Sequence, residues 1–192
     1  MDRRKFLTKS GLLLSSTPII ASTSDDNFLA SYIQEENNIP FDDYMKDIHM
    51  INTHTGEEVK MVFKENGSYN PEALRELSYF LRDYRTGHAK YIDPNLLDIL
   101  YSLKVKLGSD KPFYVLSGYR TKKTNELLRR TTKGVAKHSL HIQGKAIDIT
   151  LPNRSTKEIA RAARSLSLGG VGQYNKSHFV HVDTGKVRHW YG

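Results

Sequence analysis

Three histidines and two aspartates stand in two short stretches of the carboxyl-terminal third of the sequence. Residues 139–148 read Ser-Leu-His-Ile-Gln-Gly-Lys-Ala-Ile-Asp, and residues 178–183 read His-Phe-Val-His-Val-Asp. Neutral imidazole nitrogens and a carboxylate oxygen are the ligands of a catalytic zinc site, in which three protein ligands leave a fourth position for water. The two stretches therefore predict a zinc site.

Each stretch is expected to contain a strand that presents its polar side chains on one face. Within residues 146–150, alternation places Asp148 opposite two isoleucines that point into the core. In the later stretch, His181 and Asp183 share a face. A turn at Gly144 lets the chain fold back, so the histidine that precedes it can approach Asp148. Two such strands can converge on one cation.

The remaining elements predict one α+β domain with the order β-β-α-α-β-α-β-α-β-β. Asn70-Pro71 and Asp93-Pro94 are N-cap and first-turn signals of helices, and residues 155–158 form a capping-box pattern. Hydrophobic runs predict strands near 49–52, 59–63, 112–116, 146–150, 169–174 and 179–183, and helices near 71–85, 94–108, 122–130 and 159–166. We expect a small antiparallel sheet flanked by helices, with the zinc site on the sheet face.

Residues 1–24 have the layout of an export signal. A charged beginning that contains Arg3 and Arg4 precedes a short apolar run, and the paired arginines followed by Phe6-Leu7 resemble a twin-arginine signal. The apolar run is too short for a permanent membrane span, so no stable membrane insertion is expected after cleavage. We predict a linker at 25–47 and a domain at 48–192 that works in the periplasm or cell envelope.

Composition excludes several kinds of chemistry. The chain has no cysteine, so a disulfide, a thiol nucleophile and a cysteine-built zinc finger are impossible. Its 29 Lys and Arg against 21 Asp and Glu give a net charge of +8, which favours acidic partners. A basic run at residues 122–137 indicates a solvated helix face. Nucleic-acid binding would need such a patch, but an exported chain is not expected to have a nucleic-acid partner.

The pattern Ser-x-His-x-x-Gly-x-Ala-x-Asp, which residues 139–148 match in full, resembles the signature of peptidase family M15. This superfamily contains zinc D,D-carboxypeptidases and murein endopeptidases. Within it, the chain looks like the murein endopeptidase K branch. The resemblance covers about residues 48–192 and includes 52–57, 80–87, 117–120 and 181–185.

The resemblance implies a function and a set of site residues. By it, His141, Asp148 and His181 bind Zn2+, which would activate a water molecule and polarise the scissile carbonyl. Arg120 would stabilise the developing oxyanion or hold a substrate carboxylate. The implied substrate is peptidoglycan, cut in its stem peptides or cross-links by endopeptidase or carboxypeptidase action.

One position departs from the family pattern. Relatives with Glu-x-x-His place a glutamate, as general base, three residues before the last ligand, where this chain has His178. An imidazole can accept the proton of the attacking water, so we assign that catalytic role to His178. It reaches the metal only from a loop or bulge, and Asp183 is the alternative acceptor. The missing glutamate also leaves a second hypothesis, a non-catalytic zinc-containing protein that binds the cell wall.

Overall fold

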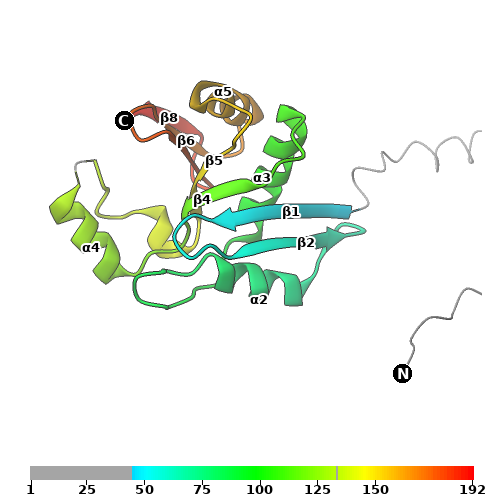
Figure 1. Cartoon of the computed structure of the whole chain (residues 1–192), viewed down its shortest axis with the longest axis horizontal. Helices are drawn as coiled ribbons and strands as arrows, with labels where there is room; N and C mark the ends of the chain where they lie inside the picture. The colour runs from blue at the N-terminus through cyan, green and yellow to red at the C-terminus, as the bar shows by residue number, and fades with distance from the viewer. Residues whose placement is uncertain (1–44, 133) are drawn as a thin grey trace, which may run out of the picture. The chain divides into compact units, whose positions relative to one another are not determined.

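The computed structural model describes residues 45–132 and 134–192. The export signal predicted at 1–24 and most of the linker predicted at 25–47 lie outside these residues. Residues 45–47 of that linker belong to the first strand, because they pair with the second strand. The described residues form one eight-stranded sheet and four α-helices, α2 to α5 (Figure 1). No helix among them is long and apolar enough to cross a membrane.

The strands assemble in the order β3-β2-β1-β4-β5-β7-β6-β8. They are β1 (Met45–Asn52), β2 (Glu58–Glu65), β3 (Ser68–Tyr69), β4 (Phe113–Ser117), β5 (Ala146–Thr150), β6 (Gly170–Tyr174), β7 (Phe179–Asp183) and β8 (Arg188–Tyr191). The pairs β1–β4 and β6–β8 are parallel, and the other neighbours are antiparallel.

The sheet is therefore larger than the small sheet that was expected, and it is mainly antiparallel, as expected, except for these two parallel pairs. A parallel pair needs a long crossover connection, and the segment between β1 and β4, which contains α2 and α3, supplies it. At the other end of the sheet, β8 follows β7 in the sequence but lies on the far side of β6, with which it pairs in parallel. The strands β3 and β8 were not predicted, because they contain only two and four residues.

The helices begin where their caps predict. They are α2 (Pro71–Phe80), α3 (Pro94–Leu107), α4 (Lys122–Thr131) and α5 (Thr156–Leu166), and a 3₁₀ turn, η2 (Leu140–Gln143), precedes β5. Asn70 and Asp93 accept hydrogen bonds from backbone N–H groups of α2 and α3, and Ser155 and Glu158 form the capping box of α5.

The helix α2 ends at Phe80, five residues before the expected end, because the following residues support the corner between β4 and α4. The Leu81 carbonyl accepts the N–H of Tyr119, and buried Asp83 accepts hydrogen bonds from the backbone and hydroxyl of Thr121. Burial would raise the pKa of Asp83, but these bonds and others hold it below its ordinary value. This corner carries Arg120 to the site.

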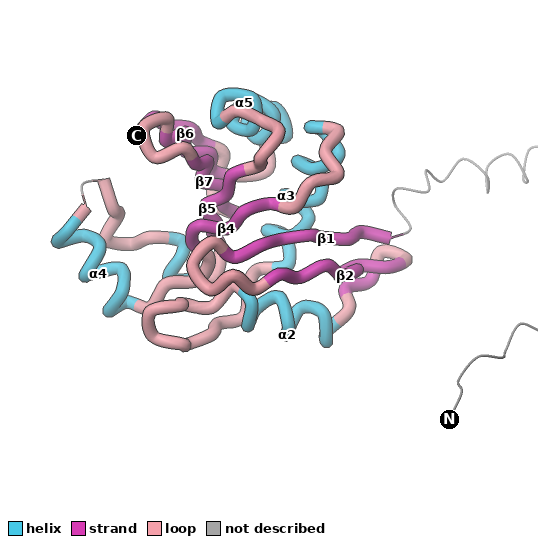
Figure 2. The backbone as a smooth tube through the Cα atoms, in the orientation of Figure 1, coloured by secondary structure: helices cyan, strands magenta, loops and turns pink. Residues whose placement is uncertain are grey.

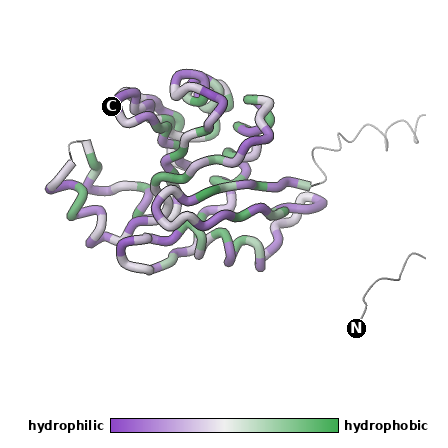
Figure 3. The backbone as a smooth tube through the Cα atoms, viewed as in Figure 1, coloured by the Kyte–Doolittle hydropathy of each residue, from purple (hydrophilic) through white to green (hydrophobic). Residues whose placement is uncertain are grey.

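The hydrophobic core lies on one face of the sheet. The helices α3 and α5 pack against each other and against β1, β6 and β7, while α2 packs against β2 (Figure 2). In Figure 3 the central strands are mainly hydrophobic, whereas α4 is mainly hydrophilic. Because Ile147 and Ile149 belong to this core, their neighbours Ala146 and Asp148 project from the opposite face of the sheet.

Candidate metal centre

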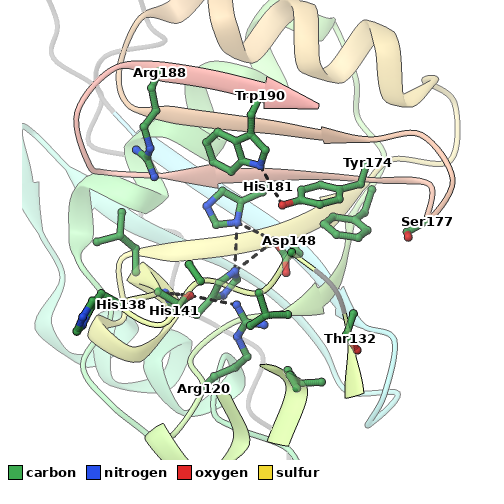
Figure 4. Close-up of a pocket in the computed structure, with 17 residues that line it drawn as sticks. Arg120, Thr132, His138, His141, Asp148, Tyr174, Ser177, His181, Arg188 and Trp190 are labelled. Atoms are coloured by element: carbon green, nitrogen blue, oxygen red, sulfur yellow. Dashed lines mark hydrogen bonds and ion pairs between the residues drawn. The ribbon is translucent and has the colours of Figure 1, made fainter. Parts of the chain in front are cut away.

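The centre lies on the face of the sheet opposite the core, where neighbouring strands present polar side chains in register. Asp148 on β5 pairs directly with His181 on β7. His141 belongs to η2, which the chain forms just before β5. The ligand atoms of these three buried residues all lie within 4.8 Å of one another. The structure thus brings together the three residues that the sequence analysis assigned to the metal (Figure 4).

The distances within this cluster fit a tetrahedral metal site. His141 Nε2 lies 3.2 Å from Asp148 Oδ1 and 3.2 Å from His181 Nδ1, and the last two atoms are 2.9 Å apart. Ligand atoms at ordinary zinc distances are about 3.3 Å apart in a tetrahedron. All three residues line one cavity of about 440 Å³. The donor set and its spacing therefore fit zinc.

Groups outside the cluster decide which nitrogen of each histidine faces it. His141 Nδ1 donates to the Gly118 carbonyl at 2.7 Å, which leaves Nε2 with a free lone pair. His181 Nε2 lies 2.9 Å from Asp183 Oδ2, which leaves Nδ1 for a metal. Metal-binding histidines usually donate their other N–H to a carbonyl or carboxylate in this way. The hydrogen bonds thus set the correct tautomers in advance.

Asp183 is fully buried, and both of its oxygens are occupied. Besides His181, it accepts hydrogen bonds from the backbone N–H groups of Gly170 and Gly185 and from two nitrogens of the Arg188 guanidinium. Burial would raise the pKa of Asp183, but these partners hold it well below its ordinary value. In this geometry Asp183 positions His181 and has no oxygen free to receive a proton from water.

The electrostatics of the cluster favour one positive charge. Burial lowers the pKa of His141. Burial also opposes a charge on His181, but hydrogen bonds to Asp148 and Asp183 outweigh it and raise the pKa of His181 to about 8. Burial would raise the pKa of Asp148, yet the two histidines hold it well below its ordinary value. The two carboxylates thus favour positive charge at His181, beside which a metal cation would supply such a charge.

The fixed positions of the Ser-x-His-x-x-Gly-x-Ala-x-Asp pattern build the turn that carries His141. The Ser139 hydroxyl caps η2 by accepting the N–H of His141. Gly144 has φ +71°, and a Cβ there would lie 2.6 Å from the Tyr91 carbonyl oxygen. Ala146 is fully buried beside the centre. Each position thus has a steric or hydrogen-bonding reason that serves the approach of His141 to Asp148.

Arg120 enters the cavity from the corner between β4 and α4. Its Nη2 donates to the Ser139 hydroxyl at 3.2 Å, whereas its buried Nε has no hydrogen-bond partner among the described residues. Burial lowers the pKa of Arg120, but a guanidinium stays charged at neutral pH. A buried N–H without an acceptor calls for an explanation, and an oxygen of a bound ligand would supply that acceptor.

His178 lies apart from the cluster. It occupies the last position of the turn at residues 175–178, between β6 and β7, and has φ +55°. Its side chain is exposed, and it does not line the cavity, although its neighbours Ser177 and Phe179 do. The structure places His178 in a turn, as its role requires, but does not bring its imidazole to the metal ligands.

The further residues that line the cavity include three whose place in the site was not predicted from the sequence: Tyr174, Arg188 and Trp190. The Trp190 ring lies 5.3 Å from the His181 ring, measured between centroids. Two of the three belong to β8, the short strand that was not predicted. Trp190 and Tyr191 are residue types that favour strands, which is a signal that could have indicated this strand.

Comparisons with known proteins place the sequence among cell-wall peptidases. A family model described as Peptidoglycan L,D-endopeptidase MepK matches residues 43–190. Peptidoglycan L,D-endopeptidase MepK of Escherichia coli K12 is 47% identical over 139 residues, which are 72% of this chain and 76% of that protein. The probable MepK of Haemophilus influenzae is 42% identical over 142 residues, 73% of this chain and 76% of that protein.

Among solved structures, Serratia marcescens L-Ala D-Glu endopeptidase ChiX matches with a TM-score of 0.33 and 19% identity. The match covers 50% of this chain and 68% of that chain.

Proposed function

The chain belongs to the peptidoglycan L,D-endopeptidase MepK family, and we propose that it is a zinc-dependent endopeptidase that cuts peptide bonds of peptidoglycan cross-links. The observation that carries this proposal is the buried cluster of His141, Asp148 and His181, whose outer hydrogen bonds leave three metal-binding atoms directed at one point. The relatives carry the name endopeptidase, which favours cross-link cleavage over removal of terminal residues.

His141, Asp148 and His181 would hold the metal, and the Gly118 carbonyl and the Asp183 carboxylate favour the tautomers that this requires. When bound, zinc supplies a Lewis acid that polarises a carbonyl and lowers the pKa of water. Arg120 lies on the rim of the same cavity, with a buried N–H that has no acceptor among the described residues. We assign to it the stabilisation of the negative charge that develops on the carbonyl oxygen.

We assign the removal of the proton from the attacking water to His178. Both oxygens of the alternative, Asp183, are already hydrogen-bonded. His178 belongs to the turn that borders the cavity, and residues on both sides of it line that cavity. A neutral imidazole suits this task because it accepts a proton near neutral pH.

We also propose that the chain acts outside the cytoplasm, in the periplasm or cell envelope. Residues 1–24 have the layout of an export signal, and the polymer named for its relatives belongs to the cell wall.

Hydrolysis of purified muropeptides with an L,D cross-link tests the proposed function. With zinc, the wild-type chain should convert cross-linked dimers to monomers whose masses identify the bond. Treatment with EDTA and the variant His181→Ala should each abolish conversion. His189→Ala, which removes an exposed histidine of β8, is the matched control and should cut normally.

Two other outcomes would contradict the proposal. A wild-type chain that binds one zinc ion but leaves every dimer intact would indicate the non-catalytic wall-binding protein instead. A chain that binds no zinc would remove the basis of both hypotheses. In the same assay, His178→Ala should lower kcat by about 10²–10⁴-fold with zinc retained, and an unchanged kcat would exclude His178 as proton acceptor.

A further inference from the structure

The Trp190 ring lies beside the metal centre because β6 has a glycine, Gly172, at the position where a side chain would displace the ring. Gly172 on β6 pairs with His181 on one side and with Trp190 of β8 on the other. These residues project from the same face of the sheet, so the indole can lie across β6. A Cβ at Gly172 would lie 2.6 Å from the Trp190 ring. The missing side chain thus lets Trp190 reach the side of His181.

The Trp190 indole holds Tyr174 from one side. Trp190 Nε1 donates a hydrogen bond to the Tyr174 hydroxyl oxygen at 2.9 Å. The Phe179 ring stacks on the Tyr174 ring, with centroids 4.4 Å apart and an interplanar angle of 14°. These two contacts fix both the plane of the Tyr174 ring and the position of its hydroxyl.

The bond from Trp190 also determines what the Tyr174 hydroxyl can do. A phenolic hydroxyl can donate one hydrogen bond, and an indole N–H can only donate. The Tyr174 oxygen therefore accepts from Trp190, and its own hydrogen must point elsewhere. The described residues offer it no acceptor. A tyrosine in this state is ready to donate to a ligand.

Tyr174 and Arg120 face the same cavity from opposite sides of the metal ligands. Both line it together with His141, Asp148 and His181. Figure 4 shows the hydroxyl end of Tyr174 turned toward Trp190 and His181, with Arg120 on the far side of the cluster. Each of the two residues has an N–H or O–H group without an acceptor among the described residues, so a substrate oxygen near the centre could receive a hydrogen bond from either side.

We propose that Tyr174 is a catalytic hydrogen-bond donor whose hydroxyl, positioned by Trp190, stabilises the oxyanion that forms on the scissile carbonyl oxygen. This inference rests on the proposed peptidase function. The hydroxyl keeps its proton throughout and only donates a hydrogen bond, so no further reactant is needed. Donors that are fixed in a buried site before the reaction stabilise developing charge strongly, because they need not reorganise.

The variant Tyr174→Phe removes the hydroxyl and keeps the ring that stacks on Phe179. With the cross-linked dimer as substrate, kcat should fall by about 10²-fold, while KM and zinc stoichiometry stay close to those of the wild type. Trp190→Phe removes the orienting N–H together with part of the ring, leaves the Tyr174 hydroxyl in place, and should lower kcat by a smaller factor. The matched control is Tyr191→Phe, which alters an exposed hydroxyl that accepts a bond from Arg164.

A binding measurement gives a second readout that does not depend on turnover. The probe is a phosphinate analogue of the dipeptide at the cleaved bond, which is tetrahedral and anionic like the oxyanion. Trp190 is the only tryptophan in the chain, so its fluorescence can follow binding directly in the zinc-loaded protein. Calorimetry covers the Trp190→Phe variant. Tyr174→Phe should weaken binding of the phosphinate by about the factor by which it lowers kcat.

The outcomes separate this inference from the proposed function. If Tyr174→Phe keeps the wild-type kcat and the wild-type affinity for the phosphinate, the inference is wrong. If the variant loses zinc, Tyr174 has a structural role and the inference is also wrong. If the wild-type chain cuts no dimer but binds the phosphinate in a manner that Tyr174→Phe weakens, Tyr174 donates to an anionic ligand, but the proposed peptidase function and the catalytic role that rests on it both fail.

Discussion

At the scale of single residues, the two histidines proposed as metal ligands each depend on a group that is not itself a proposed ligand. His141 depends on the Gly118 carbonyl, which a side-chain substitution cannot remove. His181 depends on the Asp183 carboxylate, which Arg188 and two backbone N–H groups hold in place. A substitution of Asp183 can therefore measure how strongly zinc affinity depends on the group that supports His181.

The first prediction concerns Asp183→Asn. The amide keeps the shape of the carboxylate but loses the charge that favours the N–H of His181, so we expect zinc affinity to fall by about 10–100-fold. Competition with a chelator of known affinity at pH 7.5 measures this change. Asp47→Asn, at an aspartate whose ion pair with Lys104 lies outside the cavity, should bind zinc like the wild type. Equal zinc affinity of Asp183→Asn and wild type would contradict the prediction.

At the scale of secondary-structure elements, Asp98 connects α3 to the first three strands of the sheet. Asp98 on α3 accepts hydrogen bonds from Lys46 on β1, Lys64 on β2 and Tyr69 on β3. Burial would raise the pKa of Asp98, but these partners outweigh burial and hold it below its ordinary value of 3.8. The charged form of Asp98 therefore stabilises the folded state.

This shift determines how stability should depend on pH. Because the folded pKa is depressed, the contribution of Asp98 is fully present above the unfolded pKa and is lost as pH falls through the folded pKa. Asp98→Asn should lower the free energy of unfolding by about 1–3 kcal/mol at pH 7, and its difference from wild type should shrink below about pH 4. Urea unfolding at several pH values measures both effects.

The control for Asp98→Asn is again Asp47→Asn, which removes a single, more exposed ion pair and should cost less than about 1 kcal/mol. A difference between Asp98→Asn and wild type that stays constant down to pH 2 would show that the charge of Asp98 is not the stabilising factor.

At the scale of the whole molecule, the two faces of the sheet have different roles. One face supports the core with α3 and α5, and the other presents the candidate metal centre. The basic side chains of α4 are exposed and two of them pair with Glu126, which agrees with the predicted solvated helix face.

Metal binding should stabilise the whole domain, because the ligands come from three separate segments, η2, β5 and β7. A free zinc concentration 100 times the Kd adds about 2.7 kcal/mol to the free energy of unfolding, which corresponds to a rise in Tm of about 5–10 °C for a domain of this size. Calorimetry with zinc and with EDTA measures this shift. His181→Ala should show no such shift, and an equal Tm of the wild type under both conditions would contradict the prediction.

The sequence by itself determined the local features of this protein. Caps such as Asn70 and Ser155, and the Gly144 turn, act between residues that are close along the chain, so their patterns predict structure directly. The ten-residue pattern at 139–148 also carries two of the three metal ligands, and it identified the family.

Only the tertiary structure decided which strands become neighbours. The mixed sheet, the strand β8 and the position of Trp190 over Gly172 follow from pairings between segments that the sequence does not connect locally. The same long-range pairings bring Asp183 within hydrogen-bonding distance of His181 and Arg188, and they leave His178 in an exposed turn. Alternation within a strand reveals which residues share a face, but packing of the whole chain fixes what that face meets.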